Sequence, residues 1–239
     1  MELLHFFRRF RFVALVILGL SVIIIVFFYK ALKPTEVLPV YQPAMVAPEL
    51  VDESIQYVKK YHTISSFSMI NQNGQIITEL DYDNTIYVAD FFFTTCPTIC
   101  PIMNTNMKRL ENIFGNRDDF GIASFTIDPE KDTPEQLKKY AENINVFCQN
   151  WHFLTGNINN IYDLANKGFN IFAGINPDVA GGFEHQGYFA LVDKKGYLRS
   201  RTDQFGNPIV YYLGIPEDEI ELQGTDMLIE DVKKLLESE

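Results

Sequence analysis

The sequence predicts an α/β domain with a central mixed sheet flanked by helices, in which a closing hairpin adds antiparallel strands, preceded by one transmembrane helix. Three observations lead to this prediction. Residues 12–29 contain no charged side chain. Farther along, apolar runs typical of buried strands (86–93 and 121–127) are followed by segments whose apolar residues recur at helical spacing. Strands that alternate with helices form a mostly parallel sheet covered on both faces.

The apolar segment 12–29 is long enough to cross a membrane. Its eighteen residues would span roughly 27 Å as a helix, close to the thickness of the hydrocarbon core. The alternative is a cleaved signal peptide, which has a shorter apolar core that ends in small residues. This run instead ends at Tyr29 and Lys30. We therefore expect an uncleaved anchor.

The charges that flank the anchor predict its orientation. Arg8, Arg9 and Arg11 precede it, whereas Lys30 and Lys33 follow it. The positive-inside rule then places residues 1–11 in the cytoplasm and the rest of the chain outside. A mitochondrial protein would carry an Arg/Ser-rich transit peptide, so we expect a bacterial inner membrane with the soluble domain in the periplasm.

A linker is predicted over residues 30–61, because four prolines at intervals of four or five favour extended chain there: Pro34, Pro39, Pro43 and Pro48. Within it, Leu38, Val40 and Tyr41 could form a short edge strand, and residues 49–61 a short helix.

The first half of the outer domain, predicted over residues 62–239, begins with a hairpin. Residues 67–70 and 75–78 flank an Asn-Gly turn at Asn73 and Gly74. Strand 86–93 follows. The next helix carries one apolar stripe and stops near Gly115; the stripe consists of Ile99, Met103, Met107, Leu110 and Phe114.

The second half continues with strand 121–127 and a helix that Thr133 caps, with Pro134 in its first turn and Gln136 placed to close a capping box. A short strand (151–154), a helix over 157–167 that ends at Gly168, a hairpin (188–192 and 197–199) and a last helix capped by Thr225 complete the order. This is the thioredoxin-like arrangement, with an N-terminal β-hairpin extension and an inserted helix.

The composition argues against two classes of protein, those that bind nucleic acid and those built on a disulfide framework. The net charge of −11 argues against a nucleic-acid partner, because phosphate backbones are bound by basic surfaces. Three cysteines are too few for a disulfide framework.

Two of these cysteines, Cys96 and Cys100, directly follow the strand at 86–93 and open the next helix. The start of a helix favours thiolate over thiol. Their i, i+4 spacing would place both sulfurs on one helical face. Such a pair can perform dithiol redox chemistry or bind a soft ion, of which Cu(I) is the expected one. Pro97 and Pro101 indicate an exposed, pre-shaped helix entry rather than two core thiols.

A metal site would need a third ligand, and histidine is the expected type. His5 lies beyond the membrane segment, His62 lies before the first hairpin, and His152 has the setting of a strand residue. His185 follows a glycine-containing loop, expected to be mobile, that should pass close to the cysteines in this fold. Two thiolates and one imidazole would give a three-coordinate Cu(I) site.

Four stretches together resemble the Sco/SenC family of copper-handling, thioredoxin-like membrane proteins over roughly residues 62–236. They are FFFTTCPTICP (91–101), TIDPEKDTPEQLKKY (126–140), WHFLTG (151–156) and the histidine ahead of YFALVDKKG (188–196). The resemblance implies a metallochaperone, not a turnover enzyme, that binds Cu(I) or Cu(II) through Cys96, Cys100 and His185. It further implies assembly of the binuclear copper site of cytochrome c oxidase. The partner would be its copper-bearing subunit (subunit II) or another copper chaperone.

Other residues carry weaker hypotheses. Asp90 could be a buried acid that moves protons for the inner cysteine, or a strand aspartate bonded to the backbone. Asp128 could support the site from the strand end, and Asp132 is expected at a helix entry. Cys148 is expected to be a buried small hydrophobe, with an extra redox role as the alternative.

The soft sulfurs of Met103 and Met107 match the core stripe and are expected to pack rather than bind metal. Two further functional classes stay open. One is a thiol–disulfide oxidoreductase or thiol peroxidase acting on periplasmic cysteines, since FTTCPT is similar to peroxidase sites of this fold, although the closest arginine in the sequence is Arg109. The other is a redox sensor that forms a Cys96–Cys100 disulfide.

Overall fold

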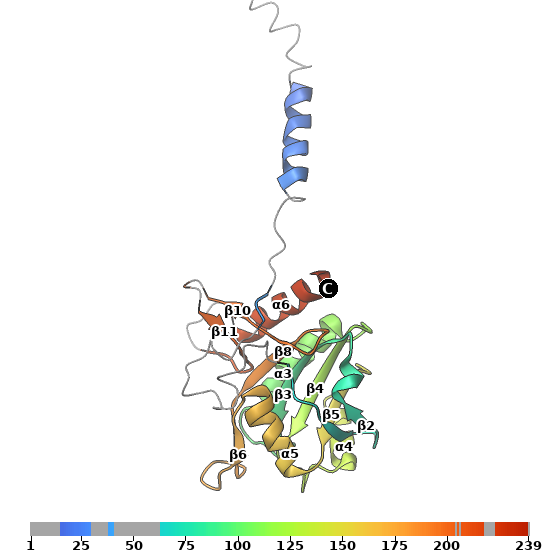
Figure 1. Ribbon diagram of the computed structural model, residues 1–239, viewed down its shortest axis with the longest axis vertical. Helices are drawn as coiled ribbons and strands as arrows, with labels where there is room; N and C mark the ends of the chain where they lie inside the picture. The colour runs from blue at the N-terminus through green and yellow to red at the C-terminus, as the bar shows by residue number, and fades with distance from the viewer. Residues whose placement is uncertain are drawn as a thin grey trace, which may run out of the picture. The chain divides into compact units, whose positions relative to one another are not determined.

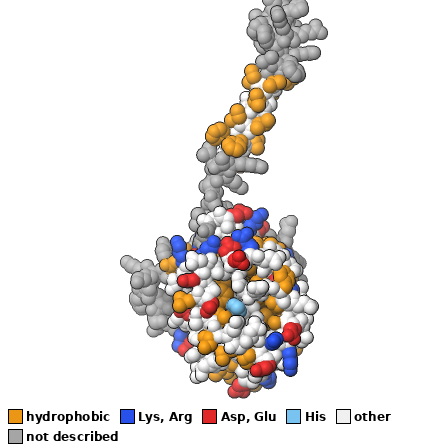
Figure 2. Space-filling view, turned by 90° about the vertical axis from the view of Figure 1, so that its right-hand side faces the viewer, with side chains coloured by type: hydrophobic (Ala, Val, Ile, Leu, Met, Phe, Trp, Pro, Cys, Tyr) orange, Lys and Arg blue, Asp and Glu red, His pale blue; other side chains and the backbone are white. Residues whose placement is uncertain are grey.

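A computed structural model describes residues 15–29, 38–40, 63–203, 205, 207–217 and 223–238. The chain divides into two units, Met1–Glu36 and Val37–Glu239. In the first unit, residues 15–29 form a helix whose side chains are exposed, and its hydrophobic side chains are visible in Figure 2. Among the described residues, no helix combines the length and the hydropathy needed to cross a bilayer. The anchor over 12–29, of which 12–14 lie outside the described residues, stays a prediction.

The second unit is built on a mixed sheet with the strand order β12-β8-β3-β4-β5-β1-β2. Only β3 (Ile86–Phe92), β4 (Phe120–Thr126) and β5 (Trp151–Thr155) run parallel. The other neighbours are antiparallel: β1 (Ser68–Asn71), β2 (Ile76–Thr78), β8 (Tyr188–Val192), β9 (Leu198–Arg199) and β12 (Tyr212–Leu213). The predicted mixed sheet is therefore confirmed, with its parallel part limited to the three central strands and hairpins that extend both edges.

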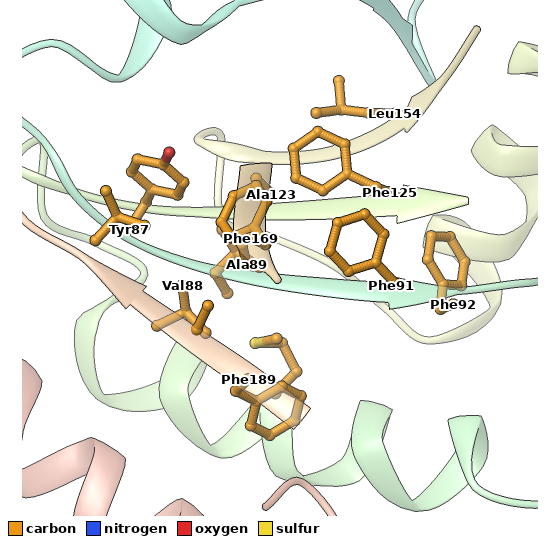
Figure 3. Close-up of a cluster of buried hydrophobic side chains, with 14 of the residues drawn as sticks. Tyr87, Val88, Ala89, Phe91, Phe92, Ala123, Phe125, Leu154, Phe169 and Phe189 are labelled. Atoms are coloured by element: carbon orange, nitrogen blue, oxygen red, sulfur yellow. The ribbon is translucent and has the colours of Figure 1, made fainter. Parts of the chain in front are cut away.

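The strands β3 and β4 are buried on both faces, as their unbroken apolar runs predict. On one face, the Phe91 and Phe125 rings stack at 5.3 Å and both contact Phe169. On the other face, Phe92 contacts Tyr140. Figure 3 shows Phe125 and Phe169 on one side of the strands and Phe189 on the other. The sheet thus lies between two hydrophobic layers, which fixes the position of the loops at its ends.

The predicted helices are present, with some different ends. Helix α3 (Cys100–Phe114) buries the predicted stripe except for Ile99, which is its N-cap and is only partly buried. Helix α4 (Pro134–Asn143) is capped by Thr133, whose hydroxyl accepts a hydrogen bond from the Gln136 N–H at 3.4 Å. The Gln136 side chain does not close the predicted box; it donates to Thr94 Oγ1 instead.

The two C-terminal helices differ from the prediction. Helix α5 (Ile158–Asp163) continues as a π-helical turn, Leu164–Phe169, and ends at Asn170 with a φ of 53°. Gly168 lies inside this turn and was wrongly predicted as its end. Helix α6 (Gly224–Ser238) begins one residue before Thr225, which is therefore buried in its first turn rather than capping it.

Two short hairpins and one edge strand were not predicted. Strands β6 (Ala173–Ile175) and β7 (Phe183–His185) form a separate two-stranded hairpin, as do β10 (Arg201–Thr202) and β11 (Pro208–Ile209). Strand β12 pairs with β8 at the sheet edge. In Figure 1, the part of the β6–β7 hairpin that is labelled β6 lies away from the main sheet.

Part of the linker pairs with the domain. Val40 forms a β-bridge with Arg199, and the buried Arg199 donates from Nη2 to the carbonyl of Leu38 while it pairs with Asp193 at 2.8 Å. The edge strand expected at Leu38 and Val40 is thus present as a single bridge. Tyr41, the helix predicted over 49–61 and the other linker residues lie outside the described residues.

The surface of the domain carries both kinds of charge. On the face that Figure 2 shows, Lys and Arg side chains are scattered among Asp and Glu, with hydrophobic side chains between them.

Candidate metal centre

The site begins in the loop that leaves β3 at its carboxyl end, where Thr94 and Thr95 lead to Cys96. Asp132, which is fully buried between β4 and α4, holds this loop. Its carboxylate accepts hydrogen bonds from the Thr94 N–H (3.0 Å) and the Thr94 hydroxyl, and also from the Thr126 hydroxyl. Asp132 was expected only to begin a helix. The structure gives it a positioning role for the loop before Cys96.

The two cysteines lie at the start of α3 but not both within it. Cys100 is the first helical residue, and Cys96 lies in the turn before it, where its N–H donates to the Phe93 carbonyl at 3.1 Å. The prediction that both sulfurs share one helical face was therefore wrong. Pro97 and Pro101 fit this entry, since proline cannot donate to a preceding turn of helix. Cys96 is 8% exposed and Cys100 is 1% exposed.

His185 completes the group from a distant part of the chain. It lies on β7, a strand and not the mobile loop that was expected, and its Nε2 is 3.4 Å from Cys100 Sγ. The Phe93 ring meets the imidazole edge-on with centroids 5.8 Å apart. The ligand atoms of Cys96, Cys100 and His185 all lie within 4.8 Å of one another. The predicted three residues are thus brought together.

The two thiols share one proton. A hydrogen bond from Cys100 lowers the pKa of Cys96 to about 3, although burial opposes this, and His185 adds to the effect. The same bond and burial raise the pKa of Cys100 above its ordinary value. Cys96 is therefore the thiolate and Cys100 the thiol of the pair. Thiolates are both the metal ligands and the nucleophiles of cysteine chemistry.

Asp90 lies on β3 beneath this site. Ser124 donates to Asp90 Oδ1 at 2.6 Å, and the Trp151 indole N–H donates to Ser124 Oγ at 3.0 Å. Burial raises the pKa of Asp90 to about 6, while the Ser124 bond and the charge of His185 pull the other way. Asp90 thus accepts a hydrogen bond from a side chain, whereas the alternative in the sequence analysis was a bond to the backbone. Its proton-transfer role stays a prediction.

The remaining candidates are not part of this group of three, and the supporting role of Asp128 stays a prediction. Asp128 lies 3.1 Å from Lys131 Nζ and donates its N–H to Thr126. Met103 and Met107 are buried in the core, as expected. His152 lies 3.3 Å from Asn71 Nδ2. His5 and His62 lie outside the described residues.

Cys148 is a buried thiol at the other end of the sheet. It precedes β5, whereas Cys96 follows β3, and these two strands belong to one parallel run. Burial raises the pKa of Cys148. It is the small hydrophobe that the sequence predicts, placed a strand length away from the dithiol.

A thioredoxin-like protein with two cysteines and one histidine in a single potential metal site is the class that these observations define. The SCO1/SenC family model matches residues 56–215, about two thirds of the chain, and the chain belongs to this family.

Related proteins agree with this assignment. The SCO1 protein homolog of Bacillus subtilis is 36% identical over 137 residues, which cover 56% of this chain and 70% of that protein. A candidate copper-binding protein of Stutzerimonas stutzeri is 28% identical over 65% of this chain and 77% of its own length. The solved structure of BsSco, described as a Sco-family cytochrome c oxidase assembly protein, matches with 32% identity and a TM-score of 0.58, covering 73% of this chain and 93% of that one.

Proposed function

We propose that this chain binds a copper ion through Cys96, Cys100 and His185 and delivers it for assembly of the binuclear copper site of cytochrome c oxidase. One observation carries the proposal: the His185 imidazole lies 3.4 Å from the Cys100 sulfur, with the Cys96 sulfur in the same group. Thiolate sulfur with imidazole nitrogen is a donor set that suits Cu(I).

The residues present fit a copper ion as cargo. Cys96 already carries the charge that a ligand needs, and Cys100 gives up its proton when the ion binds, as metal binding to thiols generally requires. Cys96 is the more exposed sulfur, so a ligand of the receiving protein reaches it first. Cys100 lies deeper and, together with His185, holds the ion until that exchange.

The partner and the location belong to the same proposal. The Bacillus subtilis homolog and BsSco support a receiving protein of the oxidase, namely its copper-bearing subunit, or a second copper chaperone that loads this one. The uncharged segment 12–29 and its arginine-rich flank support a single-pass inner-membrane anchor with the domain in the periplasm.

Competition for Cu(I) against a chelator tests the proposal. We expect the reduced full chain to bind one Cu(I). His185→Ala should weaken binding by more than about 100-fold, because even groups that only orient metal ligands change affinity by about 10- to 100-fold. His152→Ala is the matched control and should leave the affinity unchanged. Equal affinities for the His185→Ala variant and the native chain would overturn the proposal.

The lowered pKa of Cys96 also favours a second function, a thiol–disulfide reductase that reduces the cysteines of the same client. This activity should survive His185→Ala, which separates it from copper binding. A thiol peroxidase has less support, since Arg109, the arginine nearest in sequence, is ion-paired with Asp226.

A further inference from the structure

Strand β7, which carries His185, has one edge that is paired and one that is not. Its register with β6 pairs Ala173 with His185, Gly174 with Glu184 and Ile175 with Phe183. Two backbone hydrogen bonds show which of these pairs are hydrogen-bonded to each other. The Gln186 N–H donates to the Phe172 carbonyl at one end of the hairpin, and the Asn176 N–H donates to the Gly182 carbonyl at the other.

In an antiparallel ladder, hydrogen-bonded and non-bonded pairs alternate. Residue 172 pairs with residue 186 and residue 176 pairs with residue 182 through hydrogen bonds. Gly174 and Glu184 therefore form the hydrogen-bonded pair between them. The N–H and C=O groups of Phe183 and His185 therefore point away from β6. Among the described residues, no hydrogen bond joins these four backbone groups to another part of the chain.

The backbone groups at the opposite edge of the hairpin, on β6, have hydrogen-bond partners. At Ala173 on β6, the Asn166 side chain accepts from the N–H at 3.2 Å and donates to the C=O at 3.0 Å. An amide side chain thus occupies the outer edge of β6. The edge of β7 has no such cover among the residues that the structure describes.

The uncovered edge borders the metal site. A cleft of about 250 Å³ is lined both by residues of β7 and by residues around the first cysteine: Phe183, Glu184 and His185, together with Phe93, Cys96, Thr98, Ile99, Val179 and Ala180. The Phe183 and His185 side chains pack on Phe93, so they anchor the strand without filling the cleft. The most exposed thiol of the site and a row of unpaired backbone groups therefore share one cleft.

We propose that the free edge of β7 binds the client as an added β-strand, so that an extended client segment is laid across Cys96 with its cysteine facing this thiol. The inference rests on the proposed function and names how the receiving protein docks. Two properties of the cleft specify this occupant. Unpaired N–H and C=O groups two residues apart match an extended backbone, and the Cys96 sulfur in the same cleft matches a soft ligand or a disulfide on the incoming segment.

An N-methyl scan of a short peptide tests the pairing without altering the protein. The probe is acetyl-Val-Thr-Cys-Thr-Val-amide with its cysteine activated as a mixed disulfide with thionitrobenzoate. Attack by the Cys96 thiolate forms the Cys96–peptide disulfide and releases the thionitrobenzoate anion, so no other oxidant is needed. The release rate is measured with the reduced full chain at low peptide concentration.

Pairing with β7 predicts an alternating profile. Methylation of the peptide N–H groups that face β7 should slow release by about fivefold, since a net backbone hydrogen bond is worth about 1 kcal/mol. Methylation at the intervening positions should change the rate by less than about twofold, because those groups point to solvent. A profile without alternation, whether flat or uniformly slowed, would overturn the proposal.

Hydrogen exchange gives an independent readout. In the Cys100→Ser variant the Cys96–peptide disulfide is not resolved, and the N–H groups of Phe183 and His185 should exchange at least about tenfold more slowly than in the uncoupled variant. The Glu184 N–H, already paired with Gly174, is the internal control and should not change. Unchanged exchange at Phe183 and His185 would contradict docking on β7. The Cu(I) titration uses no peptide, so it separates a failure of this docking mode from a failure of copper binding.

Discussion

His185 Nε2 lies 3.4 Å from Cys100 Sγ, although 85 positions of sequence separate the two residues. Three segments bring the candidate ligands together. Cys96 lies in the turn after β3, Cys100 lies at the start of α3, and β7 places the His185 imidazole next to them. The site therefore depends on the position of the β6–β7 hairpin as much as on the dithiol.

The reactivity of the two thiols should differ strongly. Because the pKa of Cys96 is lowered to about 3, its rate of alkylation by iodoacetamide should be nearly constant between pH 5 and 8. An ordinary thiol, with a pKa of about 8.5, would gain about tenfold per pH unit over that range. Mass spectrometry of the modified chain identifies the cysteine. A rate for Cys96 that rises tenfold per unit would contradict the shared-proton arrangement.

Replacing the proton donor of the pair should reverse this effect. In Cys100→Ala the Cys96 thiolate loses its largest source of stabilisation, so the pKa of Cys96 should rise toward about 8.5. Cys148→Ala, which changes a buried thiol at the other end of the sheet, should leave the profile unaltered. The measurement is the pH dependence of alkylation in each variant. A profile in Cys100→Ala that matches the native one would assign the lowered pKa to another cause.

Asp132→Asn should loosen the loop before Cys96. The amide cannot accept on both of its positions, so at least one of the Thr94 donors loses its acceptor. Loss of a buried hydrogen bond to a charged group costs about 2 kcal/mol of unfolding free energy. Urea unfolding measures this cost, and weaker Cu(I) binding should accompany it. Glu130→Gln, in the same segment but exposed, should change stability by less than about 0.5 kcal/mol.

Asp90 should make stability depend on pH. Its pKa is raised from 3.8 to about 6 by burial, so the folded state binds the proton more tightly than the unfolded state. This contribution is fully present below pH 4 and is lost as the pH rises through 6. Asp90→Asn keeps an acceptor for Ser124 and removes the loss, so near pH 7 the variant should gain up to about 3 kcal/mol relative to its difference at pH 4.

Thermal unfolding of both chains across pH 4 to 8 measures this gain. A difference between the native chain and Asp90→Asn that stays constant across the range would show that Asp90 does not titrate there. The single Trp151, which is linked to Asp90 through Ser124, offers a fluorescence signal for the same ionisation.

Local patterns in the sequence predicted most of the fold. The buried strands, the apolar stripe of α3 and the Thr133 cap each depend on neighbouring residues, and each is present. The residues of the candidate metal site could be predicted because only four histidines had to be considered. The hairpin of β6 and β7 could not be found this way, since strands of only three residues carry almost no periodic signal.

The contacts that hold the site were also hidden from the sequence. The Asp132 carboxylate and Thr94 lie 38 positions apart, and nothing in their neighbourhoods indicates that they meet. The same holds for Asn166, which covers the outer edge of β6. The place of Cys96 before the helix, rather than in it, depends on the turn that Phe93 closes. Such contacts are set by tertiary packing.

X-ray absorption at the copper edge tests the central claim most directly, because it counts the atoms bound to the ion. We predict two sulfur neighbours and one nitrogen neighbour in the Cu(I)-loaded full chain, and loss of the nitrogen in His185→Ala but not in His152→Ala. A native spectrum without a nitrogen neighbour, or one that His185→Ala leaves unchanged, would contradict the assignment of His185 as a copper ligand.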